Sequence, residues 1–158
     1  MDKALMMNQK QSIPRWLSRV LRPAFGLFLF LSQFTASRDT LFTASVPLLL
    51  LGIALVIAGN WLWISASIHL RKAAALHEMA VAGPYRYIRH PIYVSIYLLS
   101  LGLGCIFFAW LWFGVLLAFA PLWYLECVEE EHQMVEIYGQ DYVAYQQRTG
   151  LFFPKMRT

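Results

Sequence analysis

The stretch IYVSIYLLSLGLGCIFFAWLWFGVLLAFAPLWYL, residues 92–125, contains 34 residues and no charged side chain. A single helix of this length would reach about 51 Å, well beyond the roughly 30 Å of hydrocarbon in a bilayer. The stretch therefore predicts a helical hairpin that turns around residues 102–109, with two spans of about 17 residues each. Pro91, directly before the stretch, suits the first position of the first helix.

The composition indicates an integral membrane protein. Apolar residues make up 59% of the 158 residues and charged residues 14%, against about 25% charged in soluble domains. The length predicts one domain, residues 1–158. The net charge of +4, placed beside apolar runs, favours orientation in a bilayer over nucleic-acid binding. Cys105 and Cys127 are predicted to be buried free thiols, and no histidine has the spacing of a zinc site, so we expect no metal.

Two further spans are predicted within residues 23–70, after a basic amphipathic N-terminus at residues 1–22. Residues 24–36 form the first and residues 45–70 the second, which gives about four transmembrane helices and an all-α fold. The second span carries small residues that either allow close helix contact or only fill space. They are Gly52, Ala54, Ala58, Gly59, Ala66 and Ser67.

The hairpin determines the predicted topology. Both ends of a helical hairpin lie on one side, so the polar segments 71–91 and 126–158 should share one membrane face. Five Lys or Arg residues precede Pro23, four lie in residues 71–89 and three follow Glu126, whereas Arg38 alone falls on the other side. The positive-inside rule then makes both termini and both polar segments cytoplasmic, and we expect the plasma membrane of a bacterium or archaeon.

The segment after the last span predicts a further helical region. Met134, Tyr138, Tyr142 and Tyr145 would form one stripe of a helix, with Gly139 marking a bend. The tyrosines would either pack on the core or contact a ligand, and the sequence leaves both open. No G-x-G-x-x-G follows a strand, which excludes a Rossmann cofactor site.

Two motifs resemble those of a known enzyme family, the isoprenylcysteine carboxyl methyltransferases, to which the phospholipid N-methyltransferases are similar. The resemblance covers residues 69–154, and the R-H-P-x-Y element followed by Glu-Glu after an uncharged hairpin is its most specific part. The matching residues are Gly83, Pro84, Tyr85, Ile88, Arg89, His90, Pro91 and Tyr93, then Glu130, Glu131, Met134, Tyr138, Gly139, Tyr142 and Tyr145.

The resemblance implies that S-adenosylmethionine is held between the two polar segments, in a cytoplasmic pocket formed by the loop at residues 71–91 and the segment at residues 126–158. A sulfonium cation favours aromatic faces and carboxylates, and the carboxylate of the cofactor needs donors such as Arg89 or His90. The implied cofactor-binding residues are His77, Glu78, Met79, Ala80, Tyr85, His90, Pro91, Ile92, Tyr93, Glu130 and Glu131.

The implied catalytic residues are Arg89, Glu126 and Arg148, of which Arg148 lies near a basic position of the family. Glu126 departs from the isoprenylcysteine enzymes, in which an arginine associated with the substrate carboxylate stands four residues before the glutamate pair. A carboxylate there would suit an amine or another cationic acceptor better than a carboxylate. The nucleophile therefore stays open among carboxylate, amine and thiol.

The sequence thus predicts a membrane methyltransferase whose lipophilic acceptor enters from the bilayer. An NADPH-dependent reductase of the sterol-reductase type is one alternative. Those enzymes usually have Asn where this chain has Ile92, which favours methyl transfer. A non-enzymatic membrane subunit is the other alternative, and it gives no reason for His77, Tyr85, His90 and Glu130 to converge.

Overall fold

The computed structural model describes residues 45–108 and 110–155. In chain order the elements are α3 (Val46–Ala75), the 3-10 turn η1 (Gly83–Arg86), α4 (Pro91–Ile106), α5 (Trp110–Tyr138) and α6 (Gln140–Arg148). Within these ranges the chain is helical, apart from one isolated bridge between Ile88 and Gly150, which confirms the all-α class. The predicted span at 24–36 and the basic N-terminus lie outside the described residues.

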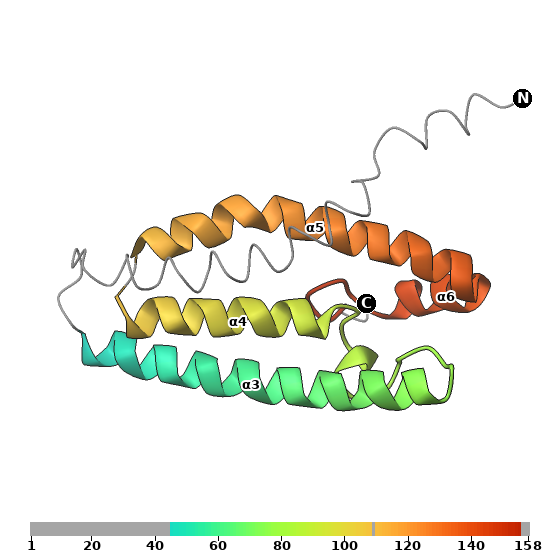
Figure 1. Cartoon of the computed structure of the whole chain (residues 1–158), viewed down its shortest axis with the longest axis horizontal. Helices are drawn as coiled ribbons and strands as arrows, with labels where there is room; N and C mark the ends of the chain where they lie inside the picture. The colour runs from blue at the N-terminus through green and yellow to red at the C-terminus, as the bar shows by residue number, and fades with distance from the viewer. Residues whose placement is uncertain (1–44, 109, 156–158) are drawn as a thin grey trace, which may run out of the picture.

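Three long helices run side by side in the order α3, α4, α5, and α6 folds back along the far end of α5 (Figure 1). Two helices, α3 and the part of α5 from Leu111 to Tyr138, are long and apolar enough to cross a membrane, and α4 is a shorter apolar helix. Trp61 on α3 is 69% exposed and Leu117 on α5 is 77% exposed. Large apolar side chains on an outer surface are expected where helices face lipid.

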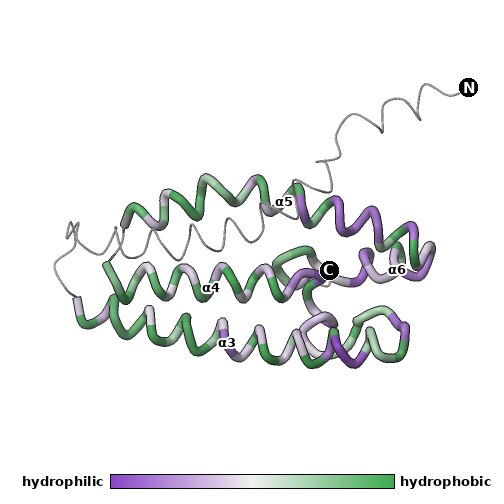
Figure 2. Tube along the Cα trace, in the orientation of Figure 1, coloured by the Kyte–Doolittle hydropathy of each residue, from purple (hydrophilic) through white to green (hydrophobic). Residues whose placement is uncertain are grey.

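Polar residues gather at one end of the molecule, where α3 and α5 end and α4 begins (Figure 2). This end holds η1, the second half of α5 and α6 (Figure 1). The predicted hairpin therefore brings its two polar flanks to one end of the molecule.

The contact between α3 and α4 depends on residues without bulk. Gly52, Gly59 and Ala66, spaced seven residues apart along α3, are the buried residues of that helix. A Cβ atom on Gly52 would come within 2.7 Å of the Gly102 carbonyl oxygen, and one on Gly102 within 2.8 Å of the Gly52 carbonyl oxygen. The two backbones thus touch, as small residues permit in membrane helices. Close helix contact is confirmed for Gly52 and Gly59, Ala66 is buried, and Ala54 and Ala58 are exposed.

The hairpin between α4 and α5 turns within the predicted range. The amide of Phe107 donates to the carbonyl of Leu103 at 2.9 Å, and Phe108 adopts a left-handed conformation with φ of 52°. Pro91 occupies the first turn of α4, as predicted. The second arm is longer than predicted, because α5 continues past residue 125 to Tyr138. The end of the apolar run shows where contact with lipid should end, and it does not show where the helix ends. Glu, Gln and Met in residues 126–136 have high helix propensity, so the helix continues.

Gly139, with φ of 56°, separates α5 from α6 and confirms the predicted bend. It also divides the aromatic stripe, because Met134 and Tyr138 belong to α5 while Tyr142 and Tyr145 belong to α6. Only the latter two are buried. Trp112 anchors the core between α4 and α5, since its indole nitrogen donates to the Ser100 carbonyl at 2.7 Å. Cys105 and Cys127 are buried free thiols, as predicted.

Candidate functional site

An ion pair joins the two polar segments. The Arg89 guanidinium, just before α4, binds the carboxylate of Glu131 in the second half of α5, and both side chains are about seven-eighths buried at 12% and 13% exposure. Nη1 of Arg89 also donates to the carbonyl oxygens of Gln146 at 3.1 Å and Thr149 at 2.5 Å. The start of α4, the second half of α5 and the end of α6 therefore meet at the Arg89 side chain.

Burial alone would raise the pKa of Glu131, but hydrogen bonds from His90 and Arg89 and the charge of the guanidinium outweigh it and lower the pKa to about 2. The amide of Gln146 donates to the same carboxylate at 2.9 Å. Glu131 is therefore ionised at neutral pH and fully engaged in holding the end of α6 to the start of α4.

Glu130 faces the first turn of α4. The Tyr93 hydroxyl donates to Glu130 Oε1 at 2.8 Å, and Nδ1 of His90 lies 3.7 Å from Glu130 Oε2. His90 also reaches Glu131 through Nε2 at 3.3 Å. Because Pro91 starts the helix, His90 at the N-cap and Tyr93 in the first turn project toward α5 together. The R-H-P-x-Y spacing thus aims three side chains at two adjacent glutamates.

The segment after α6, residues 149–154, forms what we call the C-terminal hook. The amide of Arg89 donates to the Gly150 carbonyl at 2.9 Å, the amide of Gly150 to Tyr87, and the amide of His90 to Leu151. Gly150 is required here, because a Cβ atom would overlap the Phe153 carbonyl. The hook places the Phe152 ring 6.1 Å from the His90 ring. Sequence reasoning missed it, since backbone pairing of this kind leaves only one glycine as a signal.

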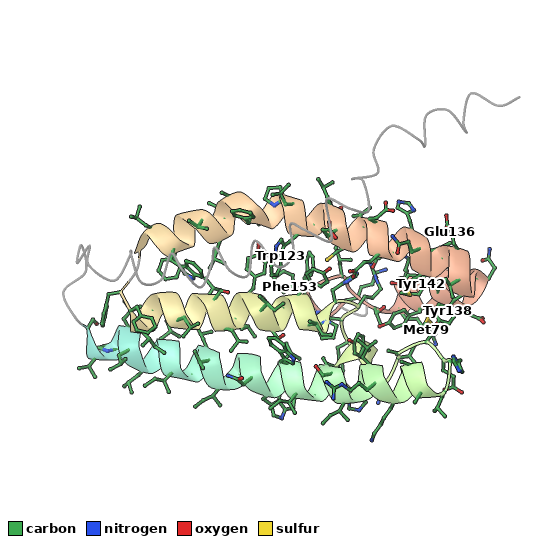
Figure 3. All side chains as sticks on the ribbon, viewed as in Figure 1. Met79, Trp123, Glu136, Tyr138, Tyr142 and Phe153 are labelled. Atoms are coloured by element: carbon green, nitrogen blue, oxygen red, sulfur yellow. The ribbon has the colours of Figure 1, made fainter. Side chains whose placement is uncertain are left out.

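Arg89, His90, Tyr93, Glu130 and Glu131 form what we call the carboxylate cluster. An apolar cavity of about 440 Å³ adjoins this cluster between α4 and α5. Trp123 packs edge-on against Tyr93 and Tyr97, with ring centroids 5.5 Å and 5.1 Å apart. Trp123 and Phe153 lie between the two helices in Figure 3. The lining residues are Tyr93, Val94, Tyr97, Leu98, Leu101, Ala120, Trp123, Phe152 and Phe153. Tyr93 belongs to both the cavity and the carboxylate cluster.

Several other predicted site residues lie close to this cluster. Pro91 is buried and Ile92 half-buried in the first turn of α4. Tyr85 is buried on η1, its carbonyl accepts a hydrogen bond from the Tyr145 hydroxyl at 2.6 Å, and burial raises the pKa of Tyr85 to about 12. Glu126 is half-buried one helical turn before Glu130, on the same face of α5.

The remaining predicted residues make no hydrogen bond or ion pair with the cluster within the described part of the chain. His77 and Glu78 are exposed after the end of α3, and within the described residues neither side chain forms a hydrogen bond or ion pair. Met79 and Ala80 follow, half-buried, and Met79 lies at the polar end with Tyr138 and Tyr142 (Figure 3). Arg148 is exposed on α6, where its Nε donates to the carbonyl of its own helix at Ala144.

Comparison with known proteins identifies the family. The family model for phospholipid methyltransferases matches residues 47–141, which include α3 except its first residue, the whole of α4 and both Glu130 and Glu131. The chain belongs to the phospholipid methyltransferase family. This confirms the predicted resemblance.

The chain is similar to two curated bacterial proteins. The chain is 36% identical over 115 residues to the cobalt-zinc-cadmium resistance protein CzcN of Cupriavidus metallidurans, which covers 70% of this chain and 51% of that protein. It is 32% identical over 108 residues to the nickel-cobalt-cadmium resistance protein NccN of Alcaligenes xylosoxydans xylosoxydans, covering 68% and 48%. The chain thus spans about half the length of these relatives. No solved structure matches it significantly.

Carboxylates and aromatic rings lie together at this site. Within the described residues, Glu130 and Glu131 lie beside the first turn of α4, and Arg89 is paired with Glu131. The adjoining aromatic rings of Tyr93 and Trp123 favour a cation. Among residues 45–108 and 110–155, no group of three or more His, Cys, Asp or Glu residues is arranged to hold a metal ion.

Proposed function

We propose that this chain is an S-adenosylmethionine-dependent membrane methyltransferase that acts on a lipophilic acceptor. The observation that supports it most is the position of Tyr93, whose hydroxyl bonds Glu130 while its ring lines the apolar cavity. A charged cofactor and an apolar acceptor could then meet at one residue. Membership of the phospholipid methyltransferase family supports the same reaction class.

The side chains present suit the cofactor. S-adenosylmethionine supplies an electrophilic methyl group on a sulfonium, and its net positive charge suits a site that contains carboxylates and aromatic rings. Glu130 would accept hydrogen bonds from the ammonium group of the cofactor. His90 and Tyr93 would hold the Glu130 carboxylate in place. The aromatic edge formed by Tyr93 and Trp123 would face the sulfonium.

Arg89 and Glu131 would position other side chains of the site and would not contact the ligands themselves. Arg89 is already committed to Glu131 and to two carbonyl oxygens, so it has little capacity left for a ligand carboxylate. Its part would be to fix the hook and the start of α4, and thereby the directions of His90 and Tyr93. Methyl transfer requires alignment of nucleophile, methyl carbon and sulfur, which rewards such rigidity.

The acceptor we favour carries an amine at the end of an apolar chain. The cavity lining is apolar and would take the chain, while Glu126, one turn along α5 from both Trp123 and Glu130, would attract a cationic headgroup. An amine must lose a proton before it attacks, and a nearby carboxylate provides an acceptor for it. His77, Glu78, Met79, Ala80 and Arg148 would complete the site only if the polar end closes around the ligands.

The polar end would face the cytoplasm. It carries Arg71, Lys72, Arg86, Arg89, Arg148 and Lys155, and a cytoplasmic excess of such residues is the general rule for membrane proteins. Four spans in the plasma membrane of a bacterium would satisfy this arrangement, with the acceptor entering sideways from the bilayer.

The test is methyl transfer itself. Full-length protein in nanodiscs is incubated with isotopically labelled S-adenosylmethionine and a bacterial lipid extract, and labelled lipids are sought by mass spectrometry. The wild type and a Glu136→Ala control, whose glutamate is exposed farther along α5 (Figure 3), should give the same labelled product. Glu130→Ala should give none. Product from Glu130→Ala at the wild-type rate would contradict the proposed site.

The names of the two relatives support a second possibility, a non-enzymatic role in metal resistance. Deleting the gene should then raise sensitivity to cobalt, zinc or cadmium, and the Glu130→Ala protein should restore growth as well as the wild type. Restoration by the wild type alone would place methyl transfer within the resistance phenotype.

A further inference from the structure

A second apolar space lies on the α3 side of α4. This groove has a volume of about 630 Å³ and is walled by α3, η1 and the C-terminal hook. Trp61 and Leu62 contribute from α3, Pro84 and Ile88 from η1 and the residues after it, and Pro154 from the hook. It is open to the surface, on a helix whose apolar side chains are exposed.

Two residues line both the groove and the cavity between α4 and α5. They are Val94, in the first turns of α4, and Phe152, in the hook. The neighbouring hook residues do not share this position, because Phe153 lines only the cavity and Pro154 only the groove. The two apolar spaces therefore adjoin at one aromatic ring and one valine side chain, which we call the wall.

The backbone holds Phe152 firmly in this wall. Its neighbours Gly150 and Leu151 pair with Arg89 and His90, and its ring lies against the His90 ring at 6.1 Å. Phe152 thus stands at the end of the cavity that adjoins the carboxylate cluster. An apolar chain whose headgroup lies at Glu130 would meet this ring when it turns toward α3.

We propose that Phe152, with Val94, keeps the acceptor chain within the cavity by closing it off from the groove, and thereby limits the chain length that the site accommodates. The inference rests on the proposed function, since it assumes that an acceptor chain occupies the cavity. With the ring removed, the cavity would open into the groove and a longer chain could continue along Leu62 and Trp61. Phe152 is then a specificity-determining residue outside the carboxylate cluster.

The experiment measures binding and needs no turnover. The n-alkyltrimethylammonium ions of increasing chain length serve as probes, because they join a cationic headgroup to an apolar chain. Their affinities are measured by calorimetry on the full chain in amphipol, against free probe below its critical micelle concentration. Each methylene that moves from water into an apolar site should tighten binding about fourfold.

For the wild type, affinity should rise with chain length and then level off. Phe152→Ala should move the plateau to longer chains, by at least one methylene step of about fourfold. Val94→Ala should move it in the same direction and tests the wall without altering the hook. Phe153→Ala is the matched control and should leave the plateau length unchanged, because its side chain does not face the groove.

Equal plateau lengths in the wild type, Phe152→Ala and Val94→Ala would overturn the inference. A shift in Phe153→Ala as large as that in Phe152→Ala would also overturn it, since the wall would then not be the cause. The lipid-labelling assay separates the two claims. Methyl transfer with an unmoved plateau refutes the wall alone, whereas a moved plateau without methyl transfer refutes the enzyme and retains the wall.

Discussion

The contact of α4 with α3 differs from its contact with α5 in the size of the side chains involved. Toward α3, glycines bring the backbones into contact and leave no room for a Cβ atom. Toward α5, large aromatic side chains and an ion pair hold the helices apart around a cavity of about 440 Å³. Within the described residues, one interface is packed for rigidity, and the other leaves space for a ligand beside charged groups. The difference indicates that α3 and α4 form the support on which the α5 side carries the chemistry.

The largest loss of stability should come from removing the ion pair between Arg89 and Glu131. Arg89→Ala leaves the Glu131 carboxylate and two carbonyl oxygens without their partner, and breaking a buried pair costs about 4 kcal/mol. We expect thermal unfolding in detergent to shift accordingly. The control is Arg86→Ala, an exposed arginine on η1, which should change the unfolding free energy by less than about 0.5 kcal/mol. Similar losses in both variants would show that Arg89 has no special structural role.

The next effect concerns the α3 side. Gly102→Leu places a side chain where a Cβ atom already meets the Gly52 carbonyl, and overpacking of this kind costs about 3 kcal/mol. Gly114→Leu is the matched control, because a Cβ atom on Gly114 in α5 has no neighbour within 4 Å among the residues that the structure describes. Circular dichroism melts of the two variants should differ clearly. Equal melting temperatures would mean that α3 and α4 are not in backbone contact.

These two regions also differ in how well the sequence predicts them. The uncharged run of 34 residues, Pro91 and Gly139 carry local signals, so the hairpin, the helix start and the bend were predictable. The R-H-P-x-Y and Glu-Glu motifs predicted that His90, Tyr93 and Glu130 lie together, which the structure confirms. The hook was not predictable, because it depends on carbonyl groups, which every residue has. For the same reason the engagement of Arg89 with Gln146 and Thr149 leaves no mark in the sequence.

A third effect depends on pH. The pKa of Glu131 is lowered from 4.5 to about 2, so its contribution to stability is complete above pH 4.5 and is lost as the pH falls toward 2. Between neutral pH and pH 3 the wild type should lose about 2 kcal/mol through this group. Glu131→Gln should be less stable at neutral pH and should lack this part of the acid dependence. Parallel pH profiles for the two proteins would contradict the assignment.

The smallest effect tests the link between the cluster and the cavity. Tyr93→Phe removes one hydrogen bond to Glu130 but keeps the ring against Trp123, so stability should fall by only about 1 kcal/mol. Methyl transfer should nevertheless slow about tenfold or more if Tyr93 orients Glu130. Trp123→Phe keeps the apolar lining and serves as the comparison. An unchanged kcat in Tyr93→Phe would contradict a role of the Tyr93 hydroxyl in methyl transfer.

The most direct test is equilibrium binding of S-adenosylmethionine to the full-length protein, measured by isothermal titration calorimetry. Glu130→Gln should weaken binding by about 2 to 3 kcal/mol, roughly 100-fold, because it removes a charge opposite a cation. Glu136→Gln, which removes an exposed charge from the same helix, should bind like the wild type. Equal affinities in all three proteins, or no binding by the wild type, would contradict a cofactor site between α4 and α5.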